Sequence, residues 1–304
     1  MAYAVVLTEF GDPDVLAWQE VPEPRAEAGE VLVRVRAAGV GPTDLNIRAG
    51  HLSKVFPQGP GSILGFEAAG VVEELGEGAT GVAVGDEVAV YLPRQGGYAE
   101  LVSAPVWFAK PADVDWESAA ALPASAEAAL GILREVRLAD GETVVILGAA
   151  GSVGVIALQL ARSWGARVIG AASERDEQLI RDLGADFVPY GDGVFERVAA
   201  LTDRIDAVLD VAGHGGLAEA VAVTGDPSRV VTLVDHAGAV ATGARMSDPG
   251  PNRAPDALAV TMPLLASGSL RLKAHLALPV QDASEAHRRL ASGETHDKIV
   301  LTVE

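Results

Sequence analysis

Three glycines at a fixed spacing, Gly148-Ala-Ala-Gly151-Ser-Val-Gly154, are the strongest chemical pattern in the sequence. An apolar run, Thr143–Leu147, precedes them, and the residues from Ser152 onward have apolar side chains at helical spacing. The N-terminus of such a helix offers free backbone N–H groups and a partial positive charge, which favour phosphate. Glycines let a pyrophosphate approach the backbone and let the helix pack closely on the strand.

The spacing is G-x-x-G-x-x-G, whereas the usual dinucleotide-binding fingerprint is G-x-G-x-x-G. Its position between a buried strand and a helix nevertheless predicts a dinucleotide-binding loop; the alternative is a structural turn that binds nothing. The residues expected to contact the cofactor are Gly148, Ala150, Gly151, Ser152, Val153 and Gly154.

The end of the next strand indicates which nicotinamide cofactor is bound. Sites for NAD usually place an acid there, which bonds the ribose 2′-hydroxyl. This chain has Ala172 at that place, followed by Ser173, Glu174 and Arg175. A hydroxyl and a guanidinium suit a 2′-phosphate, which a carboxylate would repel. The residues therefore favour NADP(H), with Ser173 and Arg175 as ligands and Glu174 expected to point to solvent.

Two kinds of secondary structure must position these residues. Up to about residue 110, short β-branched or alternating runs separated by turn-rich segments predict an antiparallel, barrel-like region. From about residue 117, strands and helices alternate, which predicts a doubly wound parallel sheet covered on both faces. The last thirty or so residues are expected to rejoin the first region. The predicted domains are residues 1–119, 120–269 and 270–304, the last returning to the first domain.

Composition excludes several classes of partner and site. The formal net charge of −19 disfavours nucleic acid and anionic membrane surfaces as partners. The sequence has no cysteine, so disulfides and thiolate metal sites are excluded. The first residues lack a basic region followed by an apolar run, and no apolar run approaches the roughly 20 residues of a membrane helix. The cytoplasm is therefore the expected location.

Taken in order, several segments resemble the medium-chain dehydrogenase/reductase superfamily, specifically its zinc-free NADPH:quinone oxidoreductase branch. They include AGEVLVRVRAAGVGPTDLNIRAG, LGFEAAGVVEELGEG, VILGAAGSVGVIALQLARSWGARVIG and KIVLTVE. The resemblance implies a GroES-like β-barrel domain, a Rossmann domain and a cofactor between them. It also implies a homodimer, for which the apolar stretch 230–242 is the expected sheet edge. The resemblance also implies that Tyr190 packs near the adenosine 2′-phosphate. It implies that the nicotinamide half is passed by Val211, Ala212, Gly213, Val234 and Asp235. Lys298 could reach the cofactor phosphates; the alternative is a solvated lysine.

Two positions depart from the zinc-dependent members of that superfamily. Gly41 and Phe66 stand where those enzymes have a metal-binding cysteine and histidine. Neither residue can ligate zinc, and a zinc site needs at least three protein ligands. We therefore expect no metal. Without a Lewis acid, hydride transfer is easiest to acceptors that delocalise their own negative charge, such as quinones and α,β-unsaturated carbonyls.

Three side chains are the candidates for assisting that transfer. Asn46 has an amide that can polarise a substrate oxygen, or it caps a local helical turn. Asp44 either acts as an acid or bonds backbone amides in its own loop. Glu127 lies in an Ala-rich stretch that the resemblance places beside the nicotinamide; the alternative is a charge on a helix surface.

The resulting hypothesis is an NADPH-dependent oxidoreductase acting on a small-molecule quinone or enone. Two alternatives stay open: an enoyl-thioester reductase of polyketide or lipid metabolism, and a weakly catalytic NADPH-binding sensor protein. The first would favour a basic groove for a carrier, which an acidic chain does not suggest. The second follows from the departures at Gly41 and Asn46, where related reductases often have asparagine and tyrosine.

Overall fold

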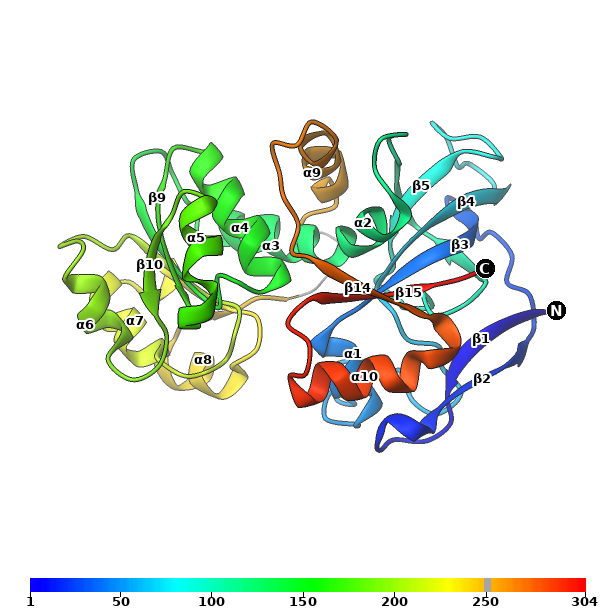
Figure 1. The fold of residues 1–304 in the computed structure, drawn as a ribbon, viewed down its shortest axis with the longest axis horizontal. Coiled ribbons are helices and arrows are strands. Elements are labelled where there is room, and N and C mark those ends of the chain that lie inside the picture. Colours follow the sequence, from blue (N-terminus) through cyan, green and yellow to red (C-terminus); the bar gives the residue numbers. More distant parts are fainter. Residues whose placement is uncertain (249–252) are drawn as a thin grey trace. The chain divides into compact units, whose positions relative to one another are not determined.

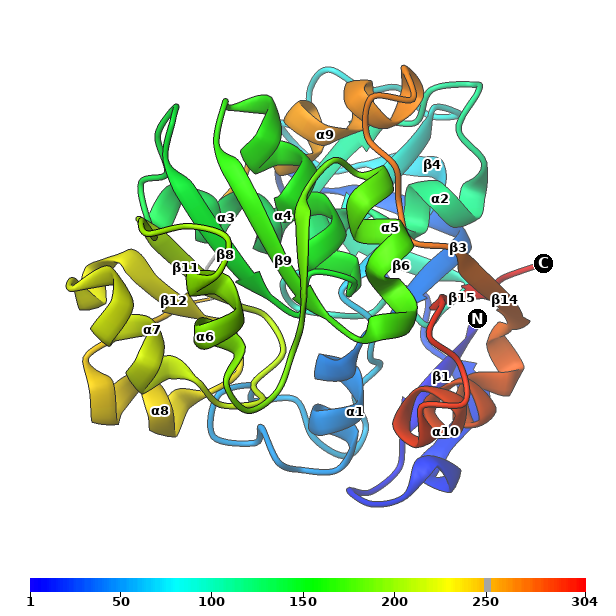
Figure 2. The same cartoon turned by 60° about the vertical axis from the view of Figure 1, so that its left-hand side comes forward.

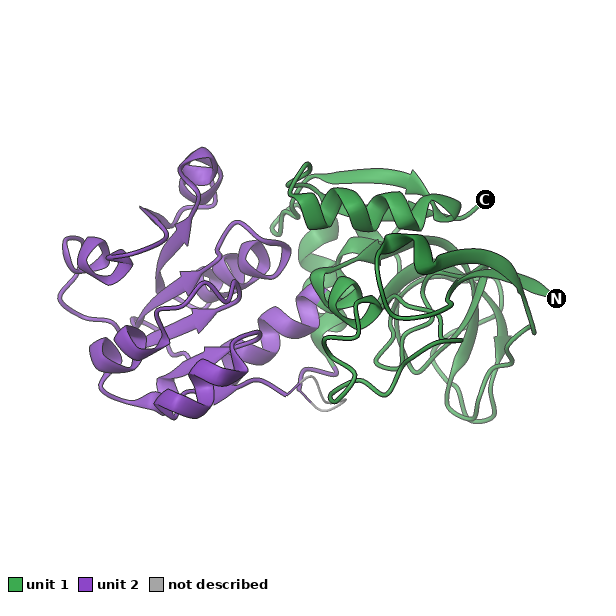
Figure 3. Ribbon diagram, turned by 90° about the horizontal axis from the view of Figure 1, so that it is seen from below, with its two compact units in different colours: residues 1–124, 256–304 green, residues 125–255 purple. Residues whose placement is uncertain are grey.

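The computed structural model describes residues 1–248 and 253–304. The chain divides into two compact units, residues 1–124 with 256–304 and residues 125–255, coloured separately in Figure 3. This division places helix α9 (Ala257–Ala266) with the first unit, where it contacts strand β7 (Val106–Ala109). The sequence had assigned that helix to the dinucleotide-binding domain.

The first unit contains a seven-stranded mixed sheet with the order β14-β15-β3-β4-β5-β7, in which β6 also pairs with β3. All its strand pairs are antiparallel except β14 with β15. A separate antiparallel hairpin is formed by β1 and β2. The strands of this unit other than β7 are β1 (Ala2–Leu7), β2 (Leu16–Val21), β3 (Val31–Val40), β4 (Glu67–Leu75), β5 (Glu87–Tyr91), β6 (Leu101–Ala104), β14 (His275–Pro279) and β15 (Lys298–Thr302).

Helices pack against this sheet. The sequence places Pro42 after an extended Gly41, and α1 (Pro42–Arg48) begins there, as is usual for proline in a first helical turn. Helix α2 (Trp116–Ala121) contacts β3 and β4, and α10 (Ala283–Ser292) contacts α1 and β15. The core between them is aliphatic, because β3 buries almost every residue and the final strand buries Ile299, Val300 and Leu301.

The second unit is a six-stranded, wholly parallel sheet with the order β10-β9-β8-β11-β12-β13. In Figure 2, β12, β11, β8 and β9 lie side by side in that sequence. This is the doubly wound order in which the chain reverses direction across the sheet between its first and fourth strands. The strands are β8 (Thr143–Leu147), β9 (Arg167–Ala172), β10 (Asp186–Pro189), β11 (Ala207–Asp210), β12 (Val230–Thr232) and β13 (Arg245–Met246).

The helices of this unit follow the pattern of the sequence. Pro123 separates α2 from the next helix, as the sequence indicated. The helices are α3 (Pro123–Glu135), α4 (Ser152–Ser163), α5 (Glu177–Asp182), α6 (Val194–Ala199), α7 (Leu217–Thr224) and α8 (His236–Thr242), and they are labelled in Figure 1. No helix within residues 1–248 and 253–304 is long and apolar enough to cross a membrane.

One expectation about the sheet edge is wrong. Residues 230–242 were expected to form the exposed edge, but β12 is an inner strand that pairs with both β11 and β13. The following residues, 236–242, form helix α8, and Asp235 caps that helix by accepting a hydrogen bond from the Gly238 N–H. The edge strands of the sheet are β10 and the two-residue strand β13. An apolar run in the sequence does not by itself distinguish an edge strand from an inner strand.

Candidate active site

The glycine loop joins the fully buried strand β8 to helix α4. Gly148 has a φ of +88°, a conformation that side chains rarely adopt, and a Cβ there would lie 2.8 Å from the Ala212 Cβ. A Cβ on Gly154 would lie 2.7 Å from the Ala149 Cα, so this glycine permits the close packing of helix on loop. Both glycines are therefore required by backbone geometry.

Gly151 has a different place in this loop. It is the N-cap of α4, and it provides no side-chain cap for the helix. The N–H groups of a first helical turn have no intrahelical acceptors, so those of Ser152, Val153 and Gly154 are available to an anion. The Gly151 backbone has an ordinary φ of −74°. The backbone conformation therefore does not require glycine here, and the missing side chain instead leaves these N–H groups open to a ligand.

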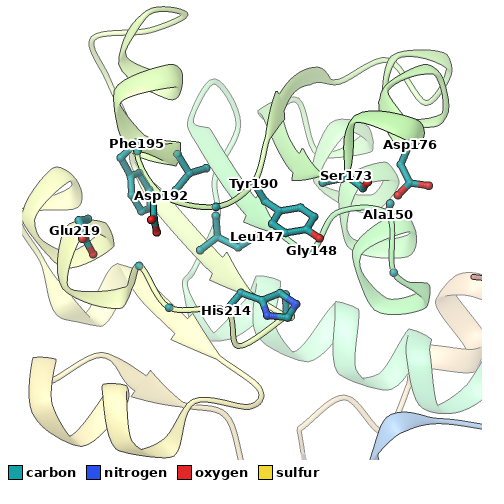
Figure 4. Close-up of a pocket in the computed structure, with 18 of the residues that line it drawn as sticks. Leu147, Gly148, Ala150, Ser173, Asp176, Tyr190, Asp192, Phe195, His214 and Glu219 are labelled. Carbon is teal, nitrogen blue, oxygen red and sulfur yellow. The ribbon is translucent and has the colours of Figure 1, made fainter. Parts of the chain in front are cut away.

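A pocket of about 340 Å³ opens beside this loop within the second unit (Figure 4). Its walls come from the residues that follow β8, β9, β10 and β11, which is the carboxyl edge where doubly wound sheets bind their ligands. The predicted cofactor residues that line it are Gly148, Ala150, Gly151, Ser173, Arg175, Tyr190 and Ala212. The predicted residues outside its lining are Ser152, Val153, Gly154, Val211, Gly213, Val234, Asp235 and Lys298.

The pocket carries charges of both signs. Arg175 lies in its wall with a side chain 56% exposed and its Nε 3.8 Å from the Asp176 carboxylate. Glu174, which was expected to point to solvent, is exposed and is not part of the lining, whereas Asp176 is. Further carboxylates enter the wall from Asp192, Glu196 and Glu219. Sequence reasoning missed these acids because their contribution depends on how the loops after β10 and β11 fold.

Tyr190 and His214 form an aromatic pair in the pocket. Their ring centroids lie 5.7 Å apart with an interplanar angle of 13°, a stacked arrangement. Figure 4 shows the Tyr190 ring beside Gly148 and the His214 ring below it. Tyr190 was a predicted cofactor residue, whereas His214 was not. Its position directly after Val211-Ala212-Gly213 was the signal that could have identified it.

Two strand-end turns of this unit are joined by a buried pair, Asp210 and Thr232. The Asp210 carboxylate accepts hydrogen bonds from the N–H groups of Ala212 (3.1 Å) and Gly213 (2.9 Å), and from the Thr232 hydroxyl at 2.8 Å. The Thr232 oxygen in turn accepts from the N–H groups of Val234 (3.2 Å) and Asp235 (3.0 Å). These contacts fix the two turns that the family resemblance assigned to the nicotinamide half of the cofactor.

In the first unit, Asp44 joins the segment that contains Gly41 to the segment that contains Gly65 and Phe66. Its carboxylate accepts hydrogen bonds from Gly41 N–H at 2.8 Å and Gly65 N–H at 3.2 Å. The side chain is 2% exposed, and this burial raises the pKa of Asp44 to about 6 against the hydrogen bond from Gly41 and the charge of Lys298. Because both oxygens bind backbone amides, Asp44 positions the two segments.

Asn46 lies on the exposed surface of helix α1. Its amide donates to the Pro42 carbonyl at 3.0 Å, one helical turn earlier, and its Oδ1 lies 3.3 Å from the His51 Nδ1. The side chain thus makes the local helical contact that was the alternative to a catalytic role. It also keeps an exposed amide that can meet a substrate.

Lys298 and Glu67 form a buried ion pair inside the first unit. The Lys298 Nζ lies 2.5 Å from Glu67 Oε1, and the other Glu67 oxygen accepts from Ala124 N–H at 2.8 Å. The two side chains are only 8% and 2% exposed. The resemblance implied that Lys298 reaches the cofactor phosphates, but the structure gives its ammonium this partner within the barrel.

Glu127 is likewise held by a buried partner. Both of its carboxylate oxygens pair with the Arg253 guanidinium, at 2.9 Å for Oε1 and Nε, and the side chains are 4% and 7% exposed. Arg253 also donates to Ser247 at 3.0 Å, and Ser247 donates to Glu135 at 3.0 Å. This bidentate ion pair ties Glu127 on helix α3 to Arg253, and a catalytic role for Glu127 stays a prediction.

Gly41 and Phe66, which stand where zinc-dependent enzymes have ligands, carry no metal-binding side-chain atom. Phe66 packs edge-to-face on Phe56 with ring centroids 5.5 Å apart, and Gly41 caps α1 without a side chain. Within the part of the chain that the structure describes, no three His, Cys, Asp or Glu residues are grouped so that they could hold a metal ion.

Comparisons with known proteins agree with this architecture. The family model of the alcohol dehydrogenase GroES-like domain matches residues 27–113, and that of the zinc-binding dehydrogenases matches residues 152–241. Quinone oxidoreductase from Rattus norvegicus is 30% identical over 243 residues, which are 76% of this chain and 72% of that protein.

Two further relatives extend the comparison. A mycobacterial protein solved as a complex with NADPH superimposes with a TM-score of 0.81 at 27% identity, covering 99% of this chain and 100% of the other. Polyketide synthase GfsB from Streptomyces halstedii is 32% identical over 306 residues, covering 95% of this chain. This chain spans only 5% of the length of the synthase.

A GroES-like unit combined with a nucleotide-binding parallel sheet defines a dehydrogenase or reductase that uses a nicotinamide cofactor. The chain belongs to the medium-chain dehydrogenase/reductase superfamily, in its zinc-free, quinone oxidoreductase-like branch, and is an oxidoreductase of that superfamily.

Proposed function

We propose that the protein is an NADPH-dependent reductase of quinones or α,β-unsaturated carbonyls that works without a metal. The single observation that carries the cofactor part is the pocket beside the glycine loop, with Arg175 and Ser173 in its wall and no carboxylate at the end of β9. A guanidinium and a hydroxyl are suitable partners for a 2′-phosphate. The NADPH complex of the mycobacterial relative supports the same assignment.

The residues present fit such a cofactor. The first-turn N–H groups of α4, with Gly151 leaving them accessible, would hold the pyrophosphate. Arg175 and Ser173 would bind the 2′-phosphate, and the Tyr190 ring, which lines the same pocket, would lie against the adenosine. The turns fixed by Asp210 and Thr232 would support the nicotinamide half. NADPH bound in this way supplies the hydride.

The acceptor side of the proposal involves the first unit. The Asn46 amide is the donor that we assign to the carbonyl oxygen of the acceptor, where it would stabilise the charge that develops during hydride transfer. Asp44 holds the backbone of helix α1 and of the Gly65 segment in place. Aromatic Phe56 and Phe66 offer an apolar surface suited to a flat, conjugated acceptor. Quinones and enones spread their negative charge, which compensates for the missing Lewis acid.

The cofactor assignment is tested with Arg175→Ala. We expect the Kd for NADPH, measured by fluorescence titration, to rise by about 10- to 100-fold, since one charge-assisted contact is lost, while the Kd for NADH changes less than about twofold. Arg181→Ala is the matched control, because Arg181 lies on the same unit but pairs with Glu177 on α5 outside the pocket. An equal rise in the Kd for NADPH and for NADH would contradict the assignment of NADPH as the cofactor.

The acceptor assignment is tested by NADPH oxidation with a panel of quinones and enones, before and after exhaustive treatment with a chelator. Turnover that survives chelation supports a metal-free reductase, and turnover lost with the metal refutes that part. Tight NADPH binding without turnover of any acceptor would instead indicate the sensor protein.

A second candidate is reduction of an enoyl thioester. It is favoured by the match of 95% of this chain to a segment of a polyketide synthase. The same assay with a short 2-enoyl thioester separates the two candidates, since a kcat/KM above that for every quinone and free enone would favour the thioester.

Two further features belong to this proposal. We infer a cytoplasmic protein, which is supported by the absence of cysteine from the sequence. We also infer a homodimer, for which β13 provides an exposed sheet edge bearing Met246. Light scattering coupled to size exclusion would measure the oligomeric state.

A further inference from the structure

Three buried polar side chains lie together inside the first unit. They are Asp44 on α1, Tyr98 in the segment before β6, and His287 on α10, with exposed fractions of 2%, 0% and 0%. The Tyr98 hydroxyl lies 3.3 Å from the His287 Nε2, and the Asp44 carboxylate is close enough to Tyr98 for each group to shift the pKa of the other. The Tyr98 and His287 rings meet edge-to-face, with centroids 5.9 Å apart. Segments from both ends of the sequence therefore meet at one phenol.

The directions of these hydrogen bonds can be assigned from the available protons. The Asp44 carboxylate already accepts from the N–H groups of Gly41 and Gly65, and an ionised carboxylate can only accept. A hydroxyl that faces this carboxylate can only donate to it, and we assign the single Tyr98 proton there. Its oxygen then accepts from His287, which must carry a proton on Nε2. The chain runs in one direction, from histidine to phenol to carboxylate to the two backbone amides.

The charges around this chain favour the same assignment. Burial lowers the pKa of His287 to about 3, with a further contribution from the nearby Arg48 guanidinium, so the imidazole is neutral. Burial and the Asp44 carboxylate raise the pKa of Tyr98 well above its usual value, so the phenol keeps its proton. Lys298 favours the charged form of Asp44 and Glu67 opposes it, and the hydrogen bond from Tyr98 adds to the former.

We propose that Tyr98 and His287 are positioning residues of the reductase, which hold Asp44 and through it the backbone of both substrate-side segments at Gly41 and Gly65. Neither residue needs to touch the substrate, because Asp44 transmits the constraint. The inference rests on the proposed function, in which these segments flank the acceptor. It goes beyond that function because it assigns a role to a tyrosine and to a histidine separated by 189 residues.

The test uses Tyr98→Phe in the full-length protein, with two readouts. The first is kinetic: we expect kcat for the acceptor to fall about tenfold or more through misplacement of α1, while the KM for NADPH stays within about twofold. Losing a hydrogen bond to the carboxylate raises its pKa. The acidic limb of the kcat profile, where activity falls as Asp44 is protonated at about pH 6 in the wild type, should therefore move to higher pH.

The second readout does not depend on turnover. In protein labelled with ¹⁵N-glycine, the amide signals of Gly41 and Gly65 should shift with pH together, because both bind the same carboxylate. Their common midpoint should rise in Tyr98→Phe. If no acceptor is reduced by the wild type, the proposed function fails while this measurement still tests the positioning chain.

Substitutions at the far end supply the controls. His287→Gln keeps an N–H donor and should retain the wild-type midpoint and kcat, whereas His287→Leu removes the donor and should behave like Tyr98→Phe. Tyr3→Phe, at an exposed tyrosine stacked on Trp18, should change neither readout. The inference is overturned if Tyr98→Phe leaves the two glycine signals, their midpoint and the kcat profile unchanged, or if His287→Leu equals His287→Gln.

Discussion

The two units hold their functional residues in opposite ways. In the nucleotide-binding unit, the proposed contacts are backbone N–H groups at a helix N-terminus together with exposed side chains such as Arg175 and Tyr190. In the barrel unit, the corresponding positions are fixed by buried charges, Asp44 and the Glu67–Lys298 pair. One site is built from a local chain conformation and the other from contacts between distant segments.

The two sites are therefore sensitive to different kinds of substitution. A site made of backbone N–H groups loses affinity when the backbone conformation changes or when a side chain blocks the N–H groups. Such a substitution lowers stability only if the new side chain clashes with neighbouring atoms. A site made of buried charges fails when one partner is removed, because an uncompensated charge remains in a low-dielectric environment. Removing a buried charge from the barrel unit should therefore lower stability. Blocking the backbone N–H groups of the nucleotide-binding unit should lower cofactor affinity with little change in stability.

The largest expected effect comes from Lys298→Met. It leaves the buried Glu67 carboxylate with only the Ala124 N–H as a partner, so we expect the free energy of unfolding to fall by about 3–5 kcal/mol. Urea unfolding measures this loss. The exposed pair Arg181–Glu177 is the control, since Arg181→Met should cost less than about 1 kcal/mol.

The double variant Lys298→Met, Glu67→Leu should recover most of the loss, because it removes both buried charges. A different result would favour the role that the family resemblance implied. If the Lys298→Met variant has wild-type stability but binds NADPH more weakly, the Lys298 ammonium binds the cofactor phosphates. The contrast drawn between the two units would then not hold for this residue.

The next effect in size is that of Gly154→Ala in the nucleotide-binding unit. The added Cβ would clash with the Gly148 carbonyl oxygen and lie 2.7 Å from the Ala149 Cα, and these are backbone atoms that cannot rotate away. We expect a loss of about 1–3 kcal/mol from overpacking, measured by thermal or urea unfolding. Wild-type stability in this variant would mean that helix α4 does not pack on the loop as described.

The same contrast explains what the sequence reveals. The parallel sheet, its helices and the break at Pro123 follow from periodicity and turn residues within short windows, and the glycine spacing defines the loop because its function needs only consecutive backbone atoms. The pocket wall beside it was readable in part: Tyr190 came from the family resemblance, whereas His214 and the carboxylates depend on how loops fold.

The barrel contacts were not readable for a physical reason. Asp44, Tyr98 and His287 lie in different elements, and no local pattern marks a tyrosine as the partner of a histidine 189 residues away. Glu127 and Arg253 are 126 residues apart, so their buried pair had no signature either, and an isolated acid in an alanine-rich helix suggested chemistry instead. Long-range pairing of charges requires the tertiary structure.

The smallest effect on stability, and the sharpest test of the backbone site, is expected from Gly151→Ala. An added Cβ would lie 3.4 Å from the Gly148 carbonyl oxygen, and the φ of −74° suits any residue, so stability should stay within about 1 kcal/mol of the wild type. The methyl group would nevertheless stand at the first turn of α4, where the pyrophosphate is proposed to bind. We expect the Kd to rise about tenfold for NADPH and NADH alike, because the two share that group. Fluorescence titration measures both constants, and this uniform loss contrasts with the selective loss expected for Arg175→Ala. If neither cofactor binds more weakly, the glycine loop is a structural turn and the pocket beside it holds something else.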